Sequence, residues 1–280
     1  MRFVFLLLLL LVAPLAVGRA GELRVLTFNI RYDRPDPGVR AWTERREAVA
    51  AIIREQADIA GLQEVLPNQR RELAERCVEF AWVGVGRELE DKGESSPVLV
   101  RKDRFEVLES GTFWFSDTPA IVGSKSWGNE IPRICTWVKL REAKEGAVLW
   151  VFNVHLDHQS QPSRERSAAL LLERLAARAG GEPAVVMGDF NATPENAAIV
   201  AMSREPSPFA SIYALAGIPA AGTFHDFTGQ PGPGAIDFIF VDPKAWKVAT
   251  AEILTKPMPQ NPQAWPSDHF PVRAIIERKP

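Results

Sequence analysis

Cysteine is scarce in this sequence, which has only Cys77 and Cys135 among its 280 residues. At most one disulfide can therefore form. Cys77 falls in a helical pattern and Cys135 in an apolar strand, which is typical of two buried free thiols. An exported protein can instead oxidise such a pair. Both alternatives stay open, because a disulfide requires close Cα atoms and the sequence does not give their distance.

Long apolar runs are absent after the N-terminus, so no second segment reaches membrane-spanning length. The first run follows Met1-Arg2, covers residues 3–11 and ends in small residues before position 20. A basic start, an apolar centre and a small-residue end predict a cleaved secretory signal peptide over residues 1–20 rather than an uncleaved anchor. We therefore expect a secreted or periplasmic protein, without stable membrane insertion after removal of the signal.

Residues 21–280 contain no Ser/Gly-rich linker, charge block or internal repeat. Proline and glycine are scattered between short apolar segments, as the loops of one compact body require. We therefore expect a single catalytic domain over residues 21–280, acting as a monomer.

The sequence also lacks an excess of positive charge. Its 33 Lys and Arg residues face 35 Asp and Glu residues, a formal net charge of −2. Without Arg2 and Arg19, 31 basic residues remain and the net charge is −4. Nucleic-acid binding normally begins with clustered basic side chains that neutralise phosphates. The composition therefore argues against tight, non-specific binding of nucleic acid, although a nucleic-acid substrate stays open.

The apolar periodicity predicts strands and helices in alternation. Helices are expected near residues 44–56, 67–79 and 163–178, the last beginning at Ser163, with a short helix after Pro194. Strands are expected near residues 23–30, 58–62, 82–86, 98–102, 105–115, 133–140, 148–155, 184–187, 236–241, 248–254 and 270–277. Hairpin-like runs of strands with helices between some of them predict an α/β fold in which helices cover the sheets.

Polar and ionisable residues recur at the ends of the predicted strands. Ligand sites of α/β proteins form there, because the loops converge over a rigid sheet. Six segments follow this pattern: Asn29, Gln63-Glu64, His155 with Asp157-His158, Gly188-Asp189-Phe190-Asn191, Asp237, and Ser267-Asp268-His269.

Each of these residues has an ordinary explanation when taken alone. Asn29 fits a turn residue that bonds neighbouring backbone, and Glu64 fits a carboxylate at the start of a helix. Together, however, the six segments supply side chains suited to a hard cation and a phosphate. Mg²⁺ prefers oxygen ligands, and a site with few carboxylates plus substrate oxygens fits Asn29, Glu64 and Asp268. We therefore predict a metal site formed by these three residues.

The same segments, in the same order, resemble the endonuclease/exonuclease/phosphatase superfamily, which includes deoxyribonuclease I, exonuclease III, neutral sphingomyelinases and inositol polyphosphate 5-phosphatases. Gly-Asp-x-Asn followed by Ser-Asp-His is the specific part of the match. The resemblance implies a four-layer α/β/β/α sandwich of the deoxyribonuclease I-like type, with two sheets face to face and helices outside. The matching segments are residues 27–32, 63–64, 153–158, 188–191, 236–239 and 267–269.

Residues 113–119 and 127–137 are also similar to a branch of exported bacterial metal-dependent hydrolases. The residue after Trp127 is usually acidic in that branch, whereas this sequence has Gly128. No substrate contact is therefore carried over from this loop.

The resemblance implies roles for the metal and water-binding residues. Glu64 would be the principal ligand of Mg²⁺, with Asn29 and Asp268 near it, and Mn²⁺ or Ca²⁺ are alternative ions. Asp189 and Asn191 would orient or activate the attacking water and hold the phosphate.

The two histidines would act from opposite sides of the phosphate. His155 would donate a hydrogen bond to a phosphate oxygen or to the leaving group. His269 would do the same, oriented by Asp237 in a carboxylate–imidazole pair. Such a pair fixes the tautomer and raises the pKa of the imidazole, which makes it a better proton donor near neutral pH.

Two further residues are assigned to substrate binding. Glu94 lies where deoxyribonuclease I-like members place a carboxylate beside their first histidine, so the resemblance implies a pair with His155. The alternative for Glu94 is an exposed loop charge. Arg133 follows Pro132 into a strand and suits a bidentate grip on phosphate. The alternative for Arg133 is a structural ion pair.

These assignments predict divalent-metal-dependent hydrolysis of a phosphate ester, by a phosphodiesterase or phosphatase acting on a small molecule or headgroup. An extracellular or periplasmic nuclease is the alternative. Exonuclease III-like enzymes usually have Tyr at the position of His155, which argues against abasic-site repair. A non-catalytic binding protein on the same fold is disfavoured, because each core position holds a chemically competent residue.

Overall fold

The computed structural model describes residues 21–178 and 181–279. The predicted signal peptide, residues 1–20, lies outside the described residues. Within residues 21–178 and 181–279, no helix is long and apolar enough to cross a membrane.

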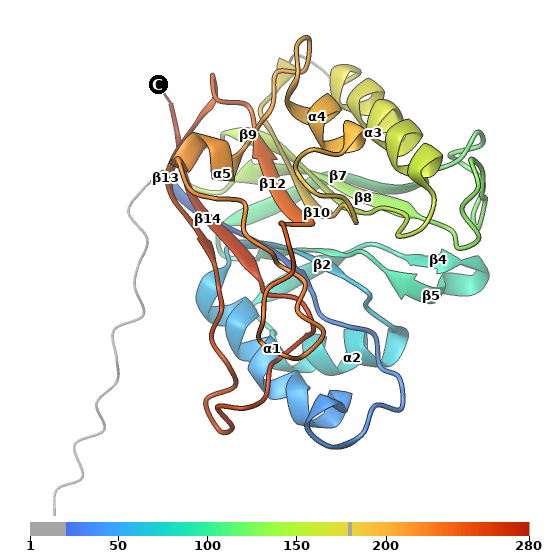
Figure 1. Ribbon diagram of the computed structural model, residues 1–280. Coiled ribbons are helices and arrows are strands. Elements are labelled where there is room, and N and C mark those ends of the chain that lie inside the picture. Colours follow the sequence, from blue (N-terminus) through green and yellow to red (C-terminus); the bar gives the residue numbers. More distant parts are fainter. Residues whose placement is uncertain (1–20, 179–180, 280) are drawn as a thin grey trace, which may run out of the picture.

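Two six-stranded sheets lie face to face at the centre of the molecule (Figure 1). The first sheet has the order β13 (Trp246–Ile253), β14 (Val272–Arg278), β1 (Glu22–Asn29), β2 (Ile59–Gln63), β6 (Val98–Arg101) and β3 (Phe80–Val83). The second has the order β11 (Ala210–Ser211), β12 (Asp237–Val241), β10 (Ala184–Asp189), β9 (Val148–His155), β8 (Ile134–Glu142) and β7 (Phe105–Trp114).

Helices cover both outer faces of this pair of sheets. Helices α1 (Trp42–Gln56) and α2 (Pro67–Arg76) lie over the first sheet, and α3 (Gln161–Ala176) and α4 (Ala197–Ser203) lie over the second (Figure 1). The predicted four-layer α/β/β/α sandwich is therefore confirmed. The smaller elements are α5 (Ile212–Ala216), the 3-10 helices η1 (Gly38–Arg40) and η2 (Leu89–Asp91), and a separate hairpin of β4 (Gly86–Glu88) and β5 (Lys92–Ser95).

Each sheet contains one parallel pair of strands joined by a helix. Strands β1 and β2 are parallel with α1 between them, and β9 and β10 are parallel with α3 between them. Parallel strands need such a crossover, and it brings their carboxyl ends to one edge of the sheet. The predicted site residues follow these ends.

Helix α3 begins two residues earlier than the sequence predicts. It starts at Gln161, because the hydroxyl of Ser160 accepts a hydrogen bond from the backbone N–H of Ser163 at 3.2 Å. Ser160 is thus the N-cap, and the helix lies within two residues of the predicted range at each end. Pro162 falls in the first turn, where its missing N–H costs nothing.

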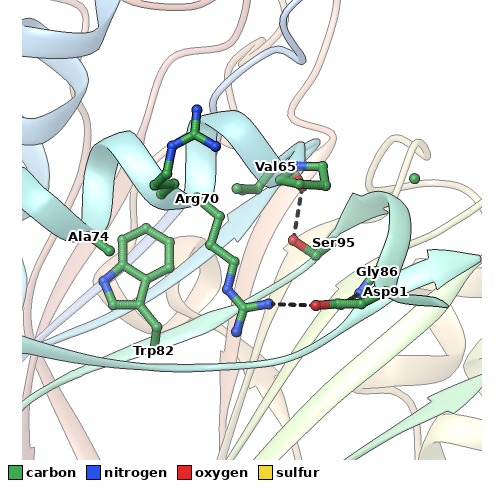
Figure 2. Close-up of a pocket in the computed structure, with 10 residues that line it drawn as sticks. Val65, Arg70, Ala74, Trp82, Gly86, Asp91 and Ser95 are labelled. Carbon is green, nitrogen blue, oxygen red and sulfur yellow. Dashed lines mark hydrogen bonds and ion pairs between the residues drawn. The ribbon is translucent and has the colours of Figure 1, made fainter.

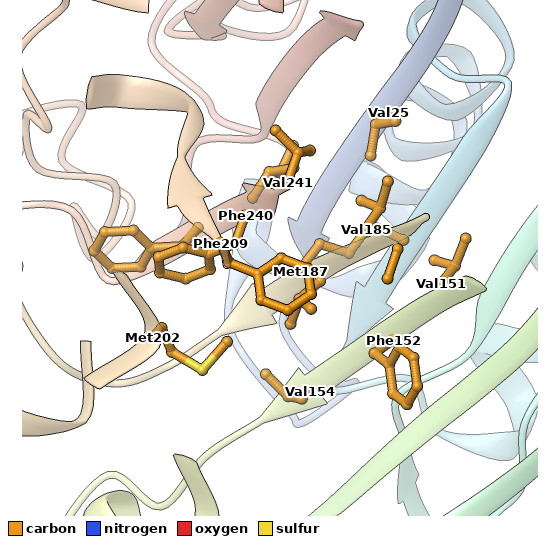
Figure 3. Close-up of a cluster of buried hydrophobic side chains, with 14 of the residues drawn as sticks. Val25, Val151, Phe152, Val154, Val185, Met187, Met202, Phe209, Phe240 and Val241 are labelled. Atoms are coloured by element: carbon orange, nitrogen blue, oxygen red, sulfur yellow. The ribbon is translucent and has the colours of Figure 1, made fainter. Parts of the chain in front are cut away.

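The apolar side chains of β1 alternate between two cores, as a period of two requires. Leu23 and Val25 belong to the core between the sheets, whereas Leu26 and Phe28 belong to the core beneath α1 and α2. Figure 3 shows the core between the sheets, where Val25 of the first sheet lies near side chains of β9, β10 and β12 in the second. This alternation places Asn29 on the inward face of its sheet.

The two cysteines are buried free thiols. Cys77 packs in the core beneath α1 and α2, and Cys135 packs in the core between the sheets. The disulfide alternative is therefore wrong. Burial raises the pKa of the Cys77 thiol to about 12, so this thiol stays protonated.

A buried carboxylate ties the first sheet together at the edge opposite to the carboxyl ends of β1 and β2. Asp58 accepts hydrogen bonds from Arg24 at 2.8 Å and from Arg104 at 2.7 Å, and Arg101 lies 3.5 Å away. Burial alone would raise the pKa of Asp58, but the bonds from Arg24 and the charge of Arg104 lower it. One side chain thus contacts three arginines, which come from β1, from the end of β6 and from the segment after β6.

We predict that Asp58→Asn lowers the free energy of unfolding at pH 7 by about 2–3 kcal/mol, because three arginines lose the negative carboxylate that they share. The pKa of Asp58 is lowered in the folded state, so its contribution is present above its ordinary value of 3.8 and is lost as the pH falls through the folded value. Urea unfolding at pH 7 and pH 3 should therefore show a smaller difference between wild type and variant in acid.

Glu106→Gln is the control, because Glu106 forms an exposed pair with Arg141 at 2.8 Å. We expect this change to cost less than about 0.5 kcal/mol at either pH. Equal stability of the two variants at pH 7 would contradict the role of Asp58.

Candidate functional site

Strand register places the predicted site residues side by side. In the second sheet, Asp189 pairs with His155 on one side and with Asp237 on the other. In the first sheet, Asn29 pairs with Gln63 at the carboxyl ends of β1 and β2. All five are buried polar residues at an edge where the two sheets face one another.

A polar contact between the sheets forms the floor of the site. Asn153 of β9 donates to the carbonyls of Leu62 and Pro97 at 2.8 and 2.9 Å, and it accepts from the amide of Gln63 at 2.7 Å. Gly61 leaves room for it, because a Cβ at this position would lie 2.7 Å from the Asn153 side chain. The sheets can approach closely here only because residue 61 is glycine.

Asn29 connects the two halves of the site. Its side-chain N–H groups donate to Glu64 at 3.1 Å and to Asp189, 160 residues away, at 3.0 Å. Its backbone carbonyl accepts from the hydroxyl of Ser267 at 2.7 Å, which fixes the segment that carries Asp268. One buried asparagine, through its side chain and its backbone carbonyl, therefore sets the relative positions of three carboxylates.

Asn29, Glu64 and Asp268 form the oxygen-rich half of the site. Glu64 also accepts from the backbone N–H of Tyr32 at 3.0 Å, and the guanidinium of Arg31 lies 3.9 Å from Glu64 and 3.6 Å from Asp268. Burial raises the pKa of Asp268, and the negative charge of Glu64 raises it further. Two mutually repelling carboxylates with the Asn29 side chain beside them supply oxygen donors of the kind that Mg²⁺ prefers, so these residues fit a hard divalent cation.

Backbone geometry at the site is strained. Arg31, Glu64 and Asn191 have φ angles of 58°, 62° and 49°, in the left-handed region that non-glycine residues rarely adopt. Gly188 has a φ of 148°, and a Cβ there would lie 2.1 Å from the carbonyl oxygen of Val154. Such strain costs about 1 kcal/mol or more per residue and concentrates at functional sites.

His269 and Asp237 form the predicted carboxylate–imidazole pair. Nδ1 of His269 lies 2.9 Å from a carboxylate oxygen of Asp237, and the other imidazole nitrogen lies 3.9 Å from Asp189. Burial alone would lower the pKa of His269, but the charge and hydrogen bond of Asp237, with Asp189 behind them, raise it to about 10. His269 is therefore protonated at neutral pH.

Asp189 lies between the two histidines. Its carboxylate is 3.6 Å from Nε2 of His155 and accepts from the backbone N–H of Asn191 at 2.9 Å. Burial and the charge of Asp237 raise the pKa of Asp189 to about 7. Burial, with the nearby charge of Arg133, lowers the pKa of His155 well below 6.5, so His155 is neutral at pH 7.

Asp189, Asp237 and His269 are close enough to form a second candidate metal group, since one ligand atom from each lies within 4.8 Å of the others. Two of these residues, however, are already hydrogen-bonded to one another. We therefore interpret this group as proton-transfer machinery and the Glu64 side as the cation site.

Arg133 is a structural ion-pair partner. It is 4% exposed, its Nε lies 3.3 Å from Asp157, and its Nη2 lies 2.7 Å from Nδ1 of His158. These contacts match the alternative of a structural ion pair for Arg133, and its role in substrate binding stays a prediction.

Glu94 pairs with Arg87 rather than with His155. Arg87 donates to both carboxylate oxygens of Glu94, at 2.8 and 2.9 Å. The predicted pair of Glu94 with His155 is corrected, because the unpredicted β4–β5 hairpin places an arginine opposite this carboxylate. Glu94 still lies near the site, since the charges of Glu64 and Arg133 act on its pKa, which burial raises.

The hairpin that carries Glu94 is held against α2. Ser95 donates to the carbonyl of Val65 at 2.9 Å, and Arg70 lies 3.5 Å from Asp91 (Figure 2). A cavity of about 340 Å³ lies between these elements, with Trp82 in its wall. None of the predicted site residues lines this cavity, so it is not part of the site.

The profile of the Endonuclease/Exonuclease/phosphatase family matches residues 26–269, a span that holds every predicted site residue. The chain belongs to this family. It is therefore a phosphoesterase, a hydrolase that acts on ester bonds. Family members depend on divalent metal ions, which agrees with the oxygen-rich half of the site.

Solved structures of bacterial family members are similar over nearly the whole chain. A family protein from Bacteroides vulgatus is 37% identical with a TM-score of 0.85, covering 92% of this chain and 99% of its own. One from Bacteroides thetaiotaomicron is 31% identical with a TM-score of 0.84, covering 91% and 97%. A mannosyl-6-phosphatase from Bacteroides thetaiotaomicron is also 31% identical with a TM-score of 0.84, covering 91% and 99%.

More distant family structures share the fold alone. TDP2 from D. rerio, in complex with a single-stranded DNA product, is 15% identical with a TM-score of 0.73, covering 91% of this chain and 99% of its own. No curated protein matches the chain.

Two residues that contact the predicted site residues were not predicted from the sequence. Arg31 lies between Glu64 and Asp268, and its place directly after Asn29-Ile30 was the available signal. Tyr213 donates its hydroxyl to the carbonyl of Asp237 at 3.0 Å, a contact between distant segments with no local signal.

We predict that Asp237→Asn lowers kcat for phosphate-ester hydrolysis by about 10²–10⁴-fold, because an amide neither holds the His269 proton nor stabilises the imidazolium. Asp242→Asn is the control, since Asp242 lies just beyond the other end of β12 and is only partly buried. Steady-state kinetics and thermal unfolding of both variants check this. Wild-type turnover by a folded Asp237→Asn protein would contradict the assignment.

Proposed function

We propose that this protein is a divalent-metal-dependent phosphoesterase that hydrolyses a phosphate ester of a small molecule or headgroup. One observation carries the proposal: the Asp237–His269 pair, Asp189 and His155 form one cluster that Asn29 joins to the Glu64 side. An oxygen-rich cation site thus lies next to groups that transfer protons. Phosphate-ester hydrolysis needs both.

Glu64, Asn29 and Asp268 would hold the cation. When bound, Mg²⁺ would supply positive charge that neutralises the phosphoryl oxygens and stabilises the leaving oxygen. The buried hydrogen bond from Asn29 to Asp189 fixes the position of these residues relative to Asp189 and the two histidines.

Asp189 is the residue best placed to orient the attacking water. Its carboxylate is fixed by the N–H groups of Asn29 and Asn191 and lies between the two histidines. It can therefore accept a proton from a water that is aligned with the phosphorus.

The histidines have different tasks in this proposal. Neutral His155 would donate an N–H hydrogen bond to a phosphoryl oxygen. Protonated His269, held by Asp237 at 2.9 Å, would donate to a second oxygen and stabilise the charge that develops there. Asn191 donates its amide to the carbonyl of Leu156 at 3.1 Å, and its side chain thereby ties the loop after β10 to the end of β9.

A small substrate suits the charge of the chain and its relatives. The chain has a formal net charge of −2 and therefore no overall attraction for a polyanion. The mannosyl-6-phosphatase relative acts, by its name, on a sugar phosphate. A sugar phosphate monoester is therefore the first substrate to test.

We predict release of inorganic phosphate from such a monoester with Mg²⁺, and loss of this activity with a chelator. The panel should contain sugar phosphates, an aryl phosphodiester, phosphoinositides, sphingomyelin, plasmid DNA and RNA, each with Mg²⁺, Mn²⁺ or Ca²⁺.

His155→Ala and Asp189→Ala should each reduce turnover by about 10³-fold or more while the protein stays folded. Glu64→Gln should raise the metal concentration needed for half-maximal activity.

Glu106→Gln serves as the control, because its exposed pair with Arg141 belongs to the surface of the second sheet. Cleavage of DNA or RNA alone would replace the proposal with a nuclease. Absence of metal-stimulated hydrolysis across the whole panel would favour a binding protein on this fold.

A further inference from the structure

The arginines near the site are committed to protein partners, with one exception. Arg87 donates to both oxygens of Glu94 at 2.8 and 2.9 Å. Arg133 contacts Asp157 and His158. Arg45 is 1% exposed and donates to four backbone carbonyls at 2.7–3.2 Å. The guanidinium of Arg45, with four acceptors, has little capacity left for a ligand.

Arg31 is the exception. Among the described residues, its guanidinium makes no hydrogen bond, and its Nε is buried without a partner. The nearest carboxylates, Asp268 and Glu64, lie at 3.6 and 3.9 Å, beyond hydrogen-bond range. The guanidinium lies 4.7 Å from the ring centroid of Tyr32, and the side chain is 20% exposed. A buried donor without an acceptor is costly and requires an explanation.

The backbone of Arg31, in contrast, is held from three sides. Its N–H donates to Asn29 at 3.0 Å, and its carbonyl accepts from Arg45 at 3.2 Å and from Gln69 at 3.0 Å. These bonds maintain a left-handed φ of 58°. The fold thus stabilises a strained conformation whose result is to point a free guanidinium into the site.

We propose that Arg31 binds the non-bridging oxygens of the substrate phosphate and makes the site selective for dianionic phosphomonoesters over monoanionic phosphodiesters. This inference rests on the proposed function. A guanidinium matches two phosphate oxygens with a pair of parallel N–H donors. Its position beside Glu64 and Asp268 puts it next to the residues that fit the cation.

Charge explains the selectivity. Glu64 and Asp268 together cancel the charge of one divalent cation, so this half of the site is neutral without Arg31. The guanidinium adds the positive charge that the second negative charge of a monoester requires. A diester has only one such charge and therefore depends less on Arg31.

The test compares Arg31→Gln with wild type on 4-nitrophenyl phosphate and bis(4-nitrophenyl) phosphate, both with Mg²⁺. We expect kcat/KM for the monoester to fall by about 10²-fold and that for the diester by less than about 10-fold. Arg31→Lys should retain more monoester activity than Arg31→Gln, because lysine keeps the positive charge but lacks the paired N–H donors of a guanidinium. Arg34→Gln is the matched control, since Arg34 lies in the same loop but is 48% exposed and paired with Asp36.

A binding measurement separates this role from a merely structural one. With Mg²⁺ present, Arg31→Gln should need about 10-fold or more inorganic phosphate for the same rise in unfolding temperature. The Mg²⁺ concentration for half-maximal stabilisation, measured without phosphate, should stay equal or fall, because Glu64 and Asp268 lose a neighbouring positive charge.

Two results would overturn the inference: unchanged phosphate binding in Arg31→Gln, or weakened binding of both phosphate and Mg²⁺, which would mean that Arg31 only maintains the site. A uniform loss on both esters would overturn the selectivity. Failure of the proposed function would instead appear in wild type itself, as absence of hydrolysis of either ester.

Discussion

The site depends on one constraint, the meeting of inward-facing positions at the ends of strands from two different sheets. The hydrogen bond between Asn29 and Asp189, at 3.0 Å, joins the two sheets at this point. Side chains alternate along a strand, so a slip of one residue in β1 or β10 would turn either residue away from its partner. The apolar cores on both sides of the first sheet fix the register, because a slip would also move Val25 and Leu26 into the wrong core.

The polar groups beneath that contact nearly all have hydrogen-bond partners. Asn153 joins the sheets through Gln63 and two backbone carbonyls, over the space that Gly61 leaves open. Buried polar groups of this kind cost stability unless each finds a partner, so they fix one arrangement of the sheets. The same rigidity allows the first sheet to supply Glu64 and the second to supply Asp189 within one site, although α2, α3 and many loops separate them in the chain.

Much of this arrangement could be predicted from the sequence, because it depends on local periodicity and on ordered motifs. The polar residues at strand ends, such as His155 and Asp189, indicated their shared edge, since parallel strands with crossover helices end together. The partner of Glu94 could not be predicted. The β4–β5 hairpin is short, charged and without apolar alternation, so the sequence does not show that it pairs Glu94 with Arg87. The start of α3 was predicted two residues late, because Ser160 and Ser163 are both acceptable caps and only the geometry selects Ser160.

The central claim is that the cation and the proton-transfer groups occupy separate halves of the site, with Glu64 and Asp268 on one side and Asp237 with His269 on the other. Anomalous scattering from crystals grown with Mn²⁺ tests this most directly, because it locates the ion without reference to activity. The account predicts one strong peak in contact with the carboxylate of Glu64 while the hydrogen bond between Asp237 and His269 remains. A peak coordinated by Asp189, Asp237 and His269, with that hydrogen bond broken, would contradict it.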